Sequence, residues 1–187
     1  MSSPHAMPVF ITGNQNKADY LARLLGIPLR HHKIELDEIQ SARLDEIVTH
    51  KVKQAYHAIG QPVLVEDVAL GFSALDGLPG PFIKFFVEAE DGLEKLCRML
   101  DAFDDRTARA ECMFGYYDGQ RLELLRSGLN GSIAMHPKGE GGFGWDKIFC
   151  PEGYEHKTRA ELILEQSDAV YQTIKPIAQL RTLLQEL

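Results

Sequence analysis

Residues 41–70 constrain the fold most, because they join a strong helical pattern to an apolar strand. Between residues 41 and 59 the apolar side chains recur every three or four positions, which is typical of a helix that packs one face on a core. Gly60 and Pro62 end this helix, and the β-branched, apolar sequence VLVEDVAL follows as a buried strand at residues 63–70. Because helices and strands alternate along the rest of the chain as well, the sequence predicts an α/β fold.

Weaker patterns complete this arrangement. Strands are predicted at residues 9–11, 29–34, 107–117, 122–127 and 148–150, and helices at residues 18–26, at 92–100 and from about Pro176 to the C-terminus. The Asp118-Gly119 dipeptide is a hairpin signal between two of these strands, so the sheet is expected to be mixed rather than purely parallel. Thr158 and Glu161 have the spacing of a capping box, which predicts the start of a helical turn.

The size and charge of the chain exclude several classes of protein. Its 187 residues suffice for one domain, 1–187, with a sizeable core, and residues 1–8 are expected to form a flexible tail. The formal net charge of −7 argues against nucleic acid or a membrane surface as a partner, and no apolar run is long enough to span a bilayer. Three cysteines without a CxxC pair, and an N-terminus unlike a secretory signal, predict a reducing, cytoplasmic location.

Two adjacent acids, Glu66 and Asp67, interrupt the apolar strand. A buried carboxylate without a partner is costly, so these groups are expected to be ion-paired, metal-bound or neutralised. If Glu38 converged with them, the three carboxylates would need a divalent cation, and oxygen ligands favour Mg²⁺ or Mn²⁺. Because strand neighbours point to opposite faces, the strand is expected to stop at about Glu66, with Asp67 opening a loop. If both acids lie in one uninterrupted central strand, with one buried under a helix, the interpretation of this pair as a metal site is wrong.

Lysines occur in patterns that suit a polyanion. The sequence TGNQNK at residues 12–17 lies between a strand and a helix, where backbone N–H groups can hold a phosphate. The side chains that can add to this contact are Thr12, Asn14 and Lys17. The alternative is a plain helix cap with a solvated lysine. Lys51 falls within the apolar stripe of its helix, so we expect it to face the protein body and to need an anion there. The alternatives are that it snorkels to the surface or forms a purely structural ion pair. Lys53 falls on the opposite face and is expected to face solvent.

Two later segments carry further candidates. GLPGPFIKFF places Lys84 among apolar residues, where it either snorkels to the surface or faces an anion. GGFGWDKIF places Phe143, Trp145 and Asp146 on a glycine-rich loop. The aromatic side chains can stack on a flat ring, and the carboxylate can accept hydrogen bonds from the ring's N–H groups. The alternative is a hydrophobic plug over the edge of the sheet.

Six segments occur in the order and approximate spacing of one known family: TGNQNK, ELDEIQ, VLVEDVAL, GLPGPFIKFF, GGFGWDKIF and TRAEL. Over residues 10–180 the chain thus resembles the inosine triphosphate pyrophosphatases, which remove aberrant purine nucleoside triphosphates. The resemblance implies a two-lobed domain with a long curved mixed β-sheet, flanking helices and a central active-site cleft. It also implies a homodimer, a small-molecule nucleotide substrate, and Mg²⁺-dependent hydrolysis of ITP, dITP or XTP to the monophosphate and pyrophosphate.

The resemblance also implies roles for individual residues. Glu38 and Glu66 match acids that bind the metal, and Asp67 matches the acid that binds metal and orients or deprotonates the attacking water. The residues that match phosphate contacts are Thr12, Asn14, Lys17, Lys51 and Lys84, and those that match the base pocket are Phe143, Trp145 and Asp146. The expected catalytic residues are Asp67, Glu66 and Lys17.

One segment departs from the family pattern. Relatives usually carry a lysine and then Ser-His-Arg after the TRAEL segment, and these side chains hold the purine's 6-keto edge. Here the replacements are Ser167 at about the lysine position and Tyr171, Gln172 and Thr173 at Ser-His-Arg. Three interpretations stay open: an inosine-type preference kept by other contacts, the same chemistry on different or broader nucleotides, and a nucleotide-binding relative with little catalysis.

Overall fold

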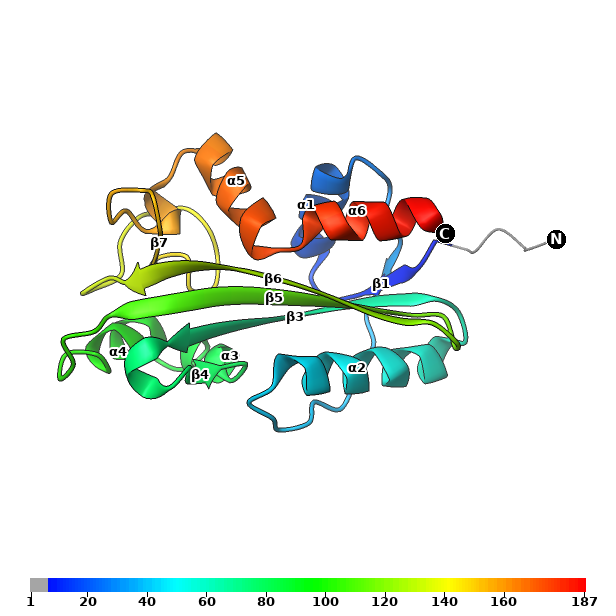
Figure 1. Ribbon diagram of the computed structural model, residues 1–187, viewed down its shortest axis with the longest axis horizontal. Coiled ribbons are helices and arrows are strands. Elements are labelled where there is room, and N and C mark those ends of the chain that lie inside the picture. Colours follow the sequence, from blue (N-terminus) through cyan, green and yellow to red (C-terminus); the bar gives the residue numbers. More distant parts are fainter. Residues whose placement is uncertain (1–6) are drawn as a thin grey trace. The chain divides into compact units, whose positions relative to one another are not determined.

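The computed structural model describes residues 7–187 as a seven-stranded mixed sheet flanked by helices (Figure 1). The strands are β1 (Val9–Ile11), β2 (His31–His32), β3 (Val63–Phe72), β4 (Pro79–Gly80), β5 (Thr107–Tyr117), β6 (Leu122–Ile133) and β7 (Phe149–Pro151). Their order is β2-β1-β3-β5-β6-β7, and β4 pairs with β3 beside this path. β1 is parallel to β2 and β3, whereas β4 and β7 are antiparallel to their partners. The predicted α/β class with a mixed sheet is confirmed.

The helices are α1 (Gln15–Leu25), α2 (Leu44–Ile59), α3 (Ile83–Val87), α4 (Gly92–Arg98), α5 (Leu164–Ile174) and α6 (Ile177–Glu186), with the 3-10 turns η1 (Ser73–Leu75) and η2 (Arg159–Glu161). The described residues divide into two compact units. Unit 1 holds residues 7–67, 113–126 and 176–187, and unit 2 holds residues 68–112 and 127–175. None of the helices in residues 7–187 has the length and apolar composition needed to cross a membrane.

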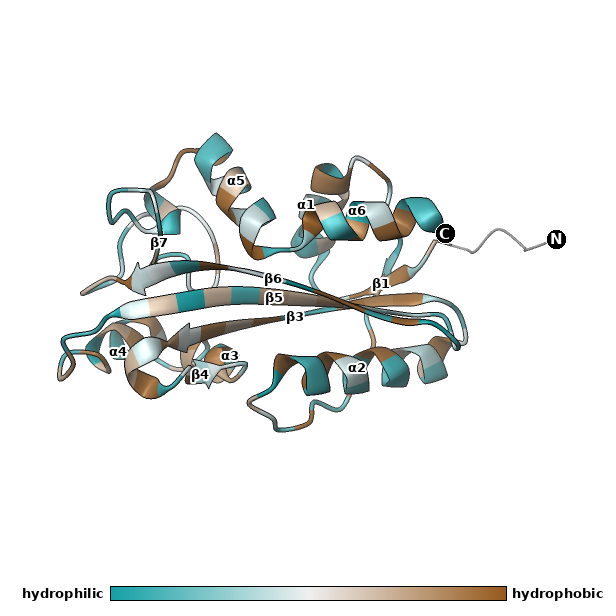
Figure 2. Ribbon diagram, viewed as in Figure 1, coloured by the Kyte–Doolittle hydropathy of each residue, from teal (hydrophilic) through white to brown (hydrophobic). Residues whose placement is uncertain are grey.

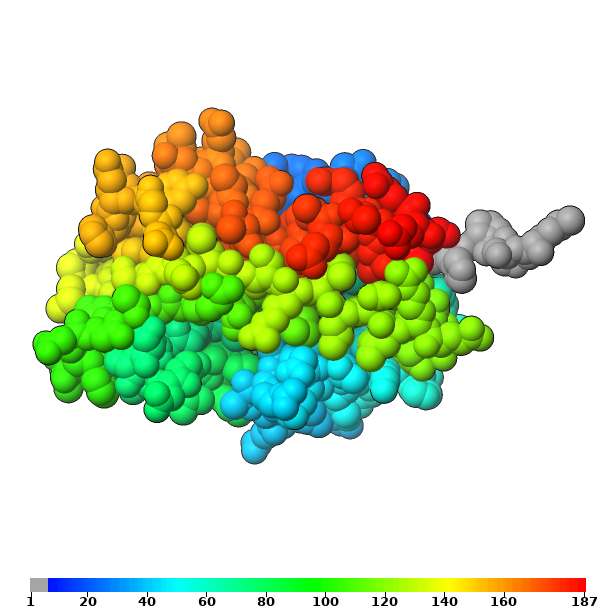
Figure 3. Space-filling view, viewed as in Figure 1, coloured from blue at the N-terminus to red at the C-terminus, as the bar shows by residue number. Residues whose placement is uncertain are grey.

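In unit 1, α1 and α6 cover one face of the sheet and α2 covers the other (Figure 1). Apolar and polar bands alternate along α2 (Figure 2), and the predicted apolar stripe is buried. Helix α2 packs closely on β5 because Gly115 has no side chain: a Cβ there would lie 2.6 Å from Val48 Cγ1. The rings of Tyr56 and Tyr117 join α2 to the β5–β6 hairpin, and the two segments adjoin on the surface (Figure 3).

In unit 2, the turn that carries η2 is fixed to the glycine-rich loop at residues 139–146. Thr158 is fully buried, its side chain and that of Glu161 form the predicted capping box, and its hydroxyl donates to the Lys138 carbonyl. The Ala160 N–H donates to the Asp146 carbonyl at 3.0 Å. These bonds place η2 directly against the loop that was predicted to contact a base.

Several predicted bounds of elements are wrong. Strand β2 spans two residues rather than 29–34, and β6 extends to Ile133 rather than ending at residue 127. Helix α5 was not predicted, because the capping box at Thr158 closes only the short turn η2. The α-helix itself begins at Leu164, where the N-cap residue Ile163 makes no side-chain hydrogen bond and gives no sequence signal.

The predicted tail at residues 1–8 is too long. The Met7 carbonyl accepts a hydrogen bond from Arg30, and Pro8 is buried. The chain is therefore held in unit 1 from Met7 onward, and the part of the prediction that concerns residues 1–6 lies outside the described residues.

Candidate functional site

The two acids of β3 point to opposite faces of the sheet and contact different lysines. The strand runs from Val63 to Phe72 without interruption, between β1 and β5. The carboxylate of Glu66 is buried and forms an ion pair with Lys17 of α1 at 2.5 Å. The carboxylate of Asp67 forms one with Lys51 of α2 at 3.3 Å. The prediction that the strand stops at about Glu66 is therefore wrong, and this geometry counts against one metal ion held by both acids.

Ion pairing explains why the strand can continue. Helices α1 and α2 lie on opposite faces of the unit 1 sheet, so each acid meets an ammonium group on its own side (Figure 1). An opposite charge at this distance offsets much of the cost of burying a carboxylate. The chain therefore does not have to leave the sheet to bring these groups to water.

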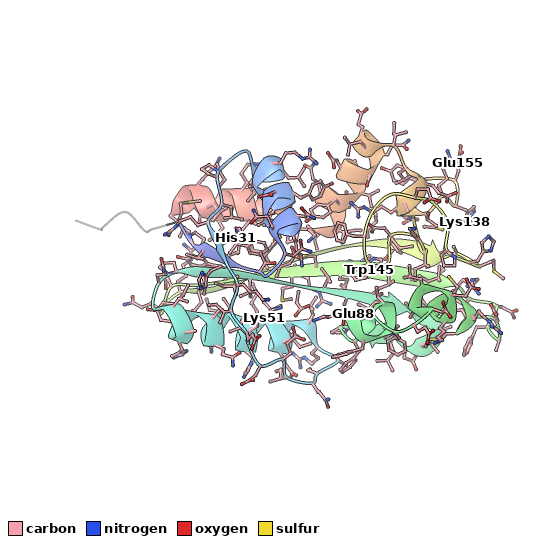
Figure 4. The ribbon with its side chains drawn as sticks, turned by 180° about the vertical axis from the view of Figure 1, so that it is seen from behind. His31, Lys51, Glu88, Lys138, Trp145 and Glu155 are labelled. Atoms are coloured by element: carbon pink, nitrogen blue, oxygen red, sulfur yellow. The ribbon has the colours of Figure 1, made fainter. Side chains whose placement is uncertain are left out.

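Lys51 gathers the anionic groups on the α2 side, where its side chain projects toward the sheet (Figure 4). Its Nζ donates to the Glu66 backbone carbonyl at 3.2 Å and to Asp67 Oδ2 at 3.3 Å, and it lies 4.0 Å from Glu38 Oε1. The prediction that Lys51 faces the protein body and meets an anion is confirmed. Lys53 is exposed, as its place on the helix predicted.

The junction between β1 and α1 is a capped helix start. Asn14 is the N-cap residue, and its Oδ1 accepts a hydrogen bond from the Lys17 N–H at 3.2 Å. The Asn14 N–H in turn donates to Thr12 Oγ1 at 3.1 Å. The cap is thus present, but Lys17 is paired with Glu66 rather than solvated. Phosphate contacts by these residues stay predictions.

The acids of unit 1 fit a divalent cation only together with further ligands. Within residues 7–187, no three His, Cys, Asp or Glu side chains are grouped so that they could hold a metal ion. Glu66 pairs on the α1 side, which leaves Glu38 and Asp67 near Lys51. Mg²⁺ is typically bound by one or two carboxylates together with water and substrate phosphates. Two exposed or partly exposed carboxylates therefore fit a hard cation that arrives with a phosphate.

In unit 2, the glycine-rich loop folds around Asp146. This carboxylate is buried, and its Oδ2 accepts from the Phe143 N–H at 2.9 Å and from Arg159 Nη1 at 2.6 Å. Gly142, with φ of 75°, lies so close that a Cβ there would overlap the carboxylate. Phe143 is 58% exposed, so it does not act as a hydrophobic plug, whereas this alternative stays open for the half-buried Trp145.

Sequence reasoning missed two buried cations beside this loop. Arg159 lies with its Cζ 5.3 Å from the centre of the Tyr171 ring and 5.9 Å from that of Phe143, and Lys175 Nζ lies 4.5 Å from the Tyr171 ring. The spacing of Tyr171 and Lys175, four residues apart at the end of a helix, was an available signal for the second contact. No pattern in the sequence identified Arg159 as a candidate functional residue, because it lies within the capping box formed by Thr158 and Glu161.

The remaining candidates belong to α3 and α5 of unit 2. Lys84 is exposed on α3, so it does not snorkel out of an apolar core, and its phosphate contact stays a prediction. Gln172 and Thr173 are exposed on α5, whereas Tyr171 of the same segment is buried. The three residues at the Ser-His-Arg positions therefore do not form one polar surface.

Comparisons with known proteins agree over nearly the whole chain. A model of the Ham1 family matches residues 8–183. The chain is 41% identical to an inosine triphosphate pyrophosphatase of Emericella nidulans over 92% of this chain and 93% of that protein. It is 40% identical to an inosine triphosphate pyrophosphatase of Yarrowia lipolytica over 95% of both chains.

Solved structures agree with this result. A HAM1 protein from Coxiella burnetii matches with a TM-score of 0.81 and 25% identity, over 97% of this chain and 100% of that one. A nucleoside-triphosphatase, or dITP/XTP pyrophosphatase, from Mycobacterium abscessus matches with a TM-score of 0.76 and 26% identity, over 93% of this chain and 98% of that one. The resemblance carried by the six segments is confirmed, and the chain belongs to the Ham1 family.

Proposed function

We propose that this chain is a nucleoside triphosphate pyrophosphatase that converts purine nucleoside triphosphates with a 6-keto base, such as ITP, dITP and XTP, to the monophosphate and pyrophosphate. The observation that carries the proposal is the pairing of two lysines with the two acids of β3, in a chain whose relatives are named inosine triphosphate pyrophosphatases. A carboxylate paired with a lysine suits attack by water on a polyanion, since the acid accepts a proton and the lysine offsets phosphate charge.

Asp67 is the acid that we assign to the attacking water. Its side chain is 21% exposed, whereas that of Glu66 is 1% exposed, so water reaches only the first of these carboxylates freely. In the proposed step the water oxygen bonds to the α-phosphorus and a proton passes to Asp67. The bond from the α-phosphorus to the bridging oxygen breaks, and pyrophosphate leaves. Lys51 orients the Asp67 carboxylate, and the phosphate contacts of Lys17 and Lys84 stay predictions.

A divalent cation, Mg²⁺ or Mn²⁺, belongs to the proposal. Glu38 and Asp67 are the residues that would hold it, because both carboxylates lie on the Lys51 side and neither is fully buried. When bound, such a cation neutralises phosphate charge and lowers the pKa of a bound water. Glu66 is assigned a positioning role through Lys17, in place of the direct metal contact that the family resemblance implied.

A second candidate function is the same hydrolysis on a broader set of bases. Two observations favour it: Ser-His-Arg is replaced, and the replacing residues Gln172 and Thr173 are exposed. Their side chains therefore do not bind the polar edge of a base inside unit 2. A binding relative with little catalysis is the least favoured interpretation, because a protein that only binds nucleotide does not need a water-accessible carboxylate.

The three interpretations differ in pyrophosphate release. ITP, XTP, dITP, ATP, GTP and the pyrimidine triphosphates would each be incubated with the protein, with and without Mg²⁺. The proposed function predicts release that requires the cation and is fastest for the 6-keto purines without a 2-amino group. Equal rates for all bases would favour the broader enzyme, and no release from any substrate would favour the binding protein.

The variant Asp67→Asn tests the role of the acid. We expect normal folding and a loss of nearly all hydrolysis, because the amide keeps the shape of the side chain but cannot take the proton from water. Thermal unfolding measured by circular dichroism would verify the fold of the variant. Full activity in Asp67→Asn would overturn the assignment.

The homodimer and the cytoplasmic location stay predictions. Light scattering after size-exclusion chromatography would test the first, since a dimer has twice the 21.0 kDa mass of the chain. Neither prediction is needed for the proposed chemistry, because the acids and lysines assigned to the water and the cation lie within unit 1.

A further inference from the structure

Arg159 is buried in unit 2 with most of its hydrogen-bond donors unused. Its side chain is 7% exposed. A guanidinium group has five N–H donors. Here Nη1 donates to Asp146 Oδ2 at 2.6 Å, and Nη2 reaches the Ser167 carbonyl only at 3.5 Å, which is the limit for such a bond. The buried Nε has no hydrogen-bond partner within residues 7–187.

A purely structural ion pair does not explain this arrangement. An arginine that serves only the fold usually directs its remaining donors at backbone carbonyls. Arg106 of the same unit does so, because it donates to the carbonyls of Cys97, Ile133 and Ala134 at 2.8–3.0 Å. A buried donor without an acceptor costs free energy. The unused donors of Arg159 therefore need an acceptor that no residue in the range 7–187 supplies.

The carboxylate beside Arg159 has an unused acceptor. Asp146 Oδ2 receives both the Phe143 N–H and Arg159 Nη1, whereas Oδ1 takes no hydrogen bond from any residue in the described part of the chain. Unused N–H donors and an unused carboxylate oxygen thus lie next to each other. A ligand edge that carries an acceptor beside a donor would satisfy both groups at once.

The surroundings of this pair suit a flat ring. Arg159 Cζ lies 5.9 Å from the centre of the exposed Phe143 ring and 5.3 Å from the centre of the buried Tyr171 ring. An aromatic face and a guanidinium plane both stack on planar heterocycles. The site therefore selects a planar group with one polar edge rather than a compact anion.

We propose that Arg159 and Asp146 bind the lactam edge of a purine, in which a ring carbonyl lies next to a ring N–H. Arg159 donates to the carbonyl and Asp146 Oδ1 accepts from the N–H. The inference rests on the proposed function, and it gives Arg159 the donor role of the missing Ser-His-Arg. Adenine carries an amino donor and a bare ring nitrogen at these two positions, so it sets donor against donor and acceptor against acceptor.

The test compares ITP with the triphosphate of purine riboside, which lacks the 6-keto oxygen. Wild-type protein should prefer ITP in kcat/KM, and Arg159→Gln should lower that preference by roughly 10- to 100-fold, the value of one charge-assisted hydrogen bond. Arg159→Lys keeps a positive charge beside Asp146 but loses the planar donors, so the preference should fall there too. Arg109→Gln is the matched control, because it removes an arginine paired with a carboxylate elsewhere in unit 2.

A second measurement separates this inference from the proposed function. Calorimetric binding of inosine monophosphate and purine riboside monophosphate reports on the base without hydrolysis. One outcome is that the wild-type protein hydrolyses no triphosphate but binds inosine monophosphate more tightly than purine riboside monophosphate, and that Arg159→Lys abolishes this difference. This outcome would refute the proposed function and support the base contact. An unchanged preference in Arg159→Lys and Arg159→Gln, in binding or in kcat/KM, would overturn the inference. Because Arg159→Gln leaves Asp146 buried without its partner, thermal unfolding would establish that the variants used are folded.

Discussion

Removal of the charge of Lys17 should destabilise the protein through Glu66. The Glu66 carboxylate is 1% exposed and lies 2.5 Å from Lys17 Nζ. The variant Lys17→Met keeps an apolar stem of similar length but leaves the carboxylate in the sheet without this ammonium group. Loss of one partner of a buried ion pair costs about 3–5 kcal/mol. Because the Lys17 side chain is 25% exposed, water screens its end of the pair, so we expect the lower limit, ~3 kcal/mol.

Urea unfolding would measure this loss, with fluorescence and circular dichroism followed together, because two compact units need not unfold in one step. The control Lys53→Met removes an exposed lysine and should change the free energy of unfolding by less than about 0.5 kcal/mol. The double variant Lys17→Met/Glu66→Gln removes both charges and should recover at least half of the loss, ~1.5 kcal/mol. A Lys17→Met variant as stable as the control, or a double variant no more stable than Lys17→Met, would refute the argument.

Three further predictions concern packing and the thiols. Gly115→Ala should lower the free energy of unfolding by about 1–3 kcal/mol, because its Cβ would meet Val48 Cγ1 at 2.6 Å, and Val48→Ala should relieve part of this cost in a urea titration of the double variant. Burial raises the pKa of the Cys97 thiol from 9.0 to about 12 and also raises that of Cys150. These thiols should resist iodoacetamide at pH 8 in the native protein and react in urea; rapid alkylation of the folded chain would contradict their burial. Above about pH 9 the unfolded chain loses thiol protons that the folded chain keeps, so the free energy of unfolding decreases. The urea concentration at the midpoint of unfolding should therefore fall as the pH is raised toward 11, and a constant midpoint would contradict this direction.

The helix at residues 44–59 shows what sequence can establish. Its apolar period fixed the buried face, and the position of Lys51 within that face was enough to predict that its ammonium group meets an anion. The bounds of β5 and the capping box at Thr158 were also predicted correctly. These features depend on residues close to one another in the chain, so a local pattern contains the information.

Features that depend on distant residues were not predictable in the same way. The strand β3 was expected to break at its acids because their partners were unknown, and Lys17 lies 49 positions away from Glu66 on a helix of its own. The pairing of Arg159 with Asp146 depends on how η2 docks against the glycine-rich loop, which no periodicity records. The substrate contacts suggested by family motifs stay predictions for the same reason, because a motif fixes the residue and not its neighbours.

Glu66 and Asp67 lie on opposite faces of β3, and their surroundings suit them to different chemical roles. A carboxylate that activates water must contact solvent before the reaction, and Asp67 meets this condition on the Lys51 side, where its side chain is 21% exposed. A proton on Glu66 would instead release Lys17 from a buried pair, at a cost to the fold. The buried Glu66 therefore holds Lys17 at the start of α1, and the partly exposed Asp67 is the acid that we propose for the attacking water. Alternation along a strand thus places two consecutive acids in different surroundings, as the proposed division between a positioning acid and a reactive acid requires.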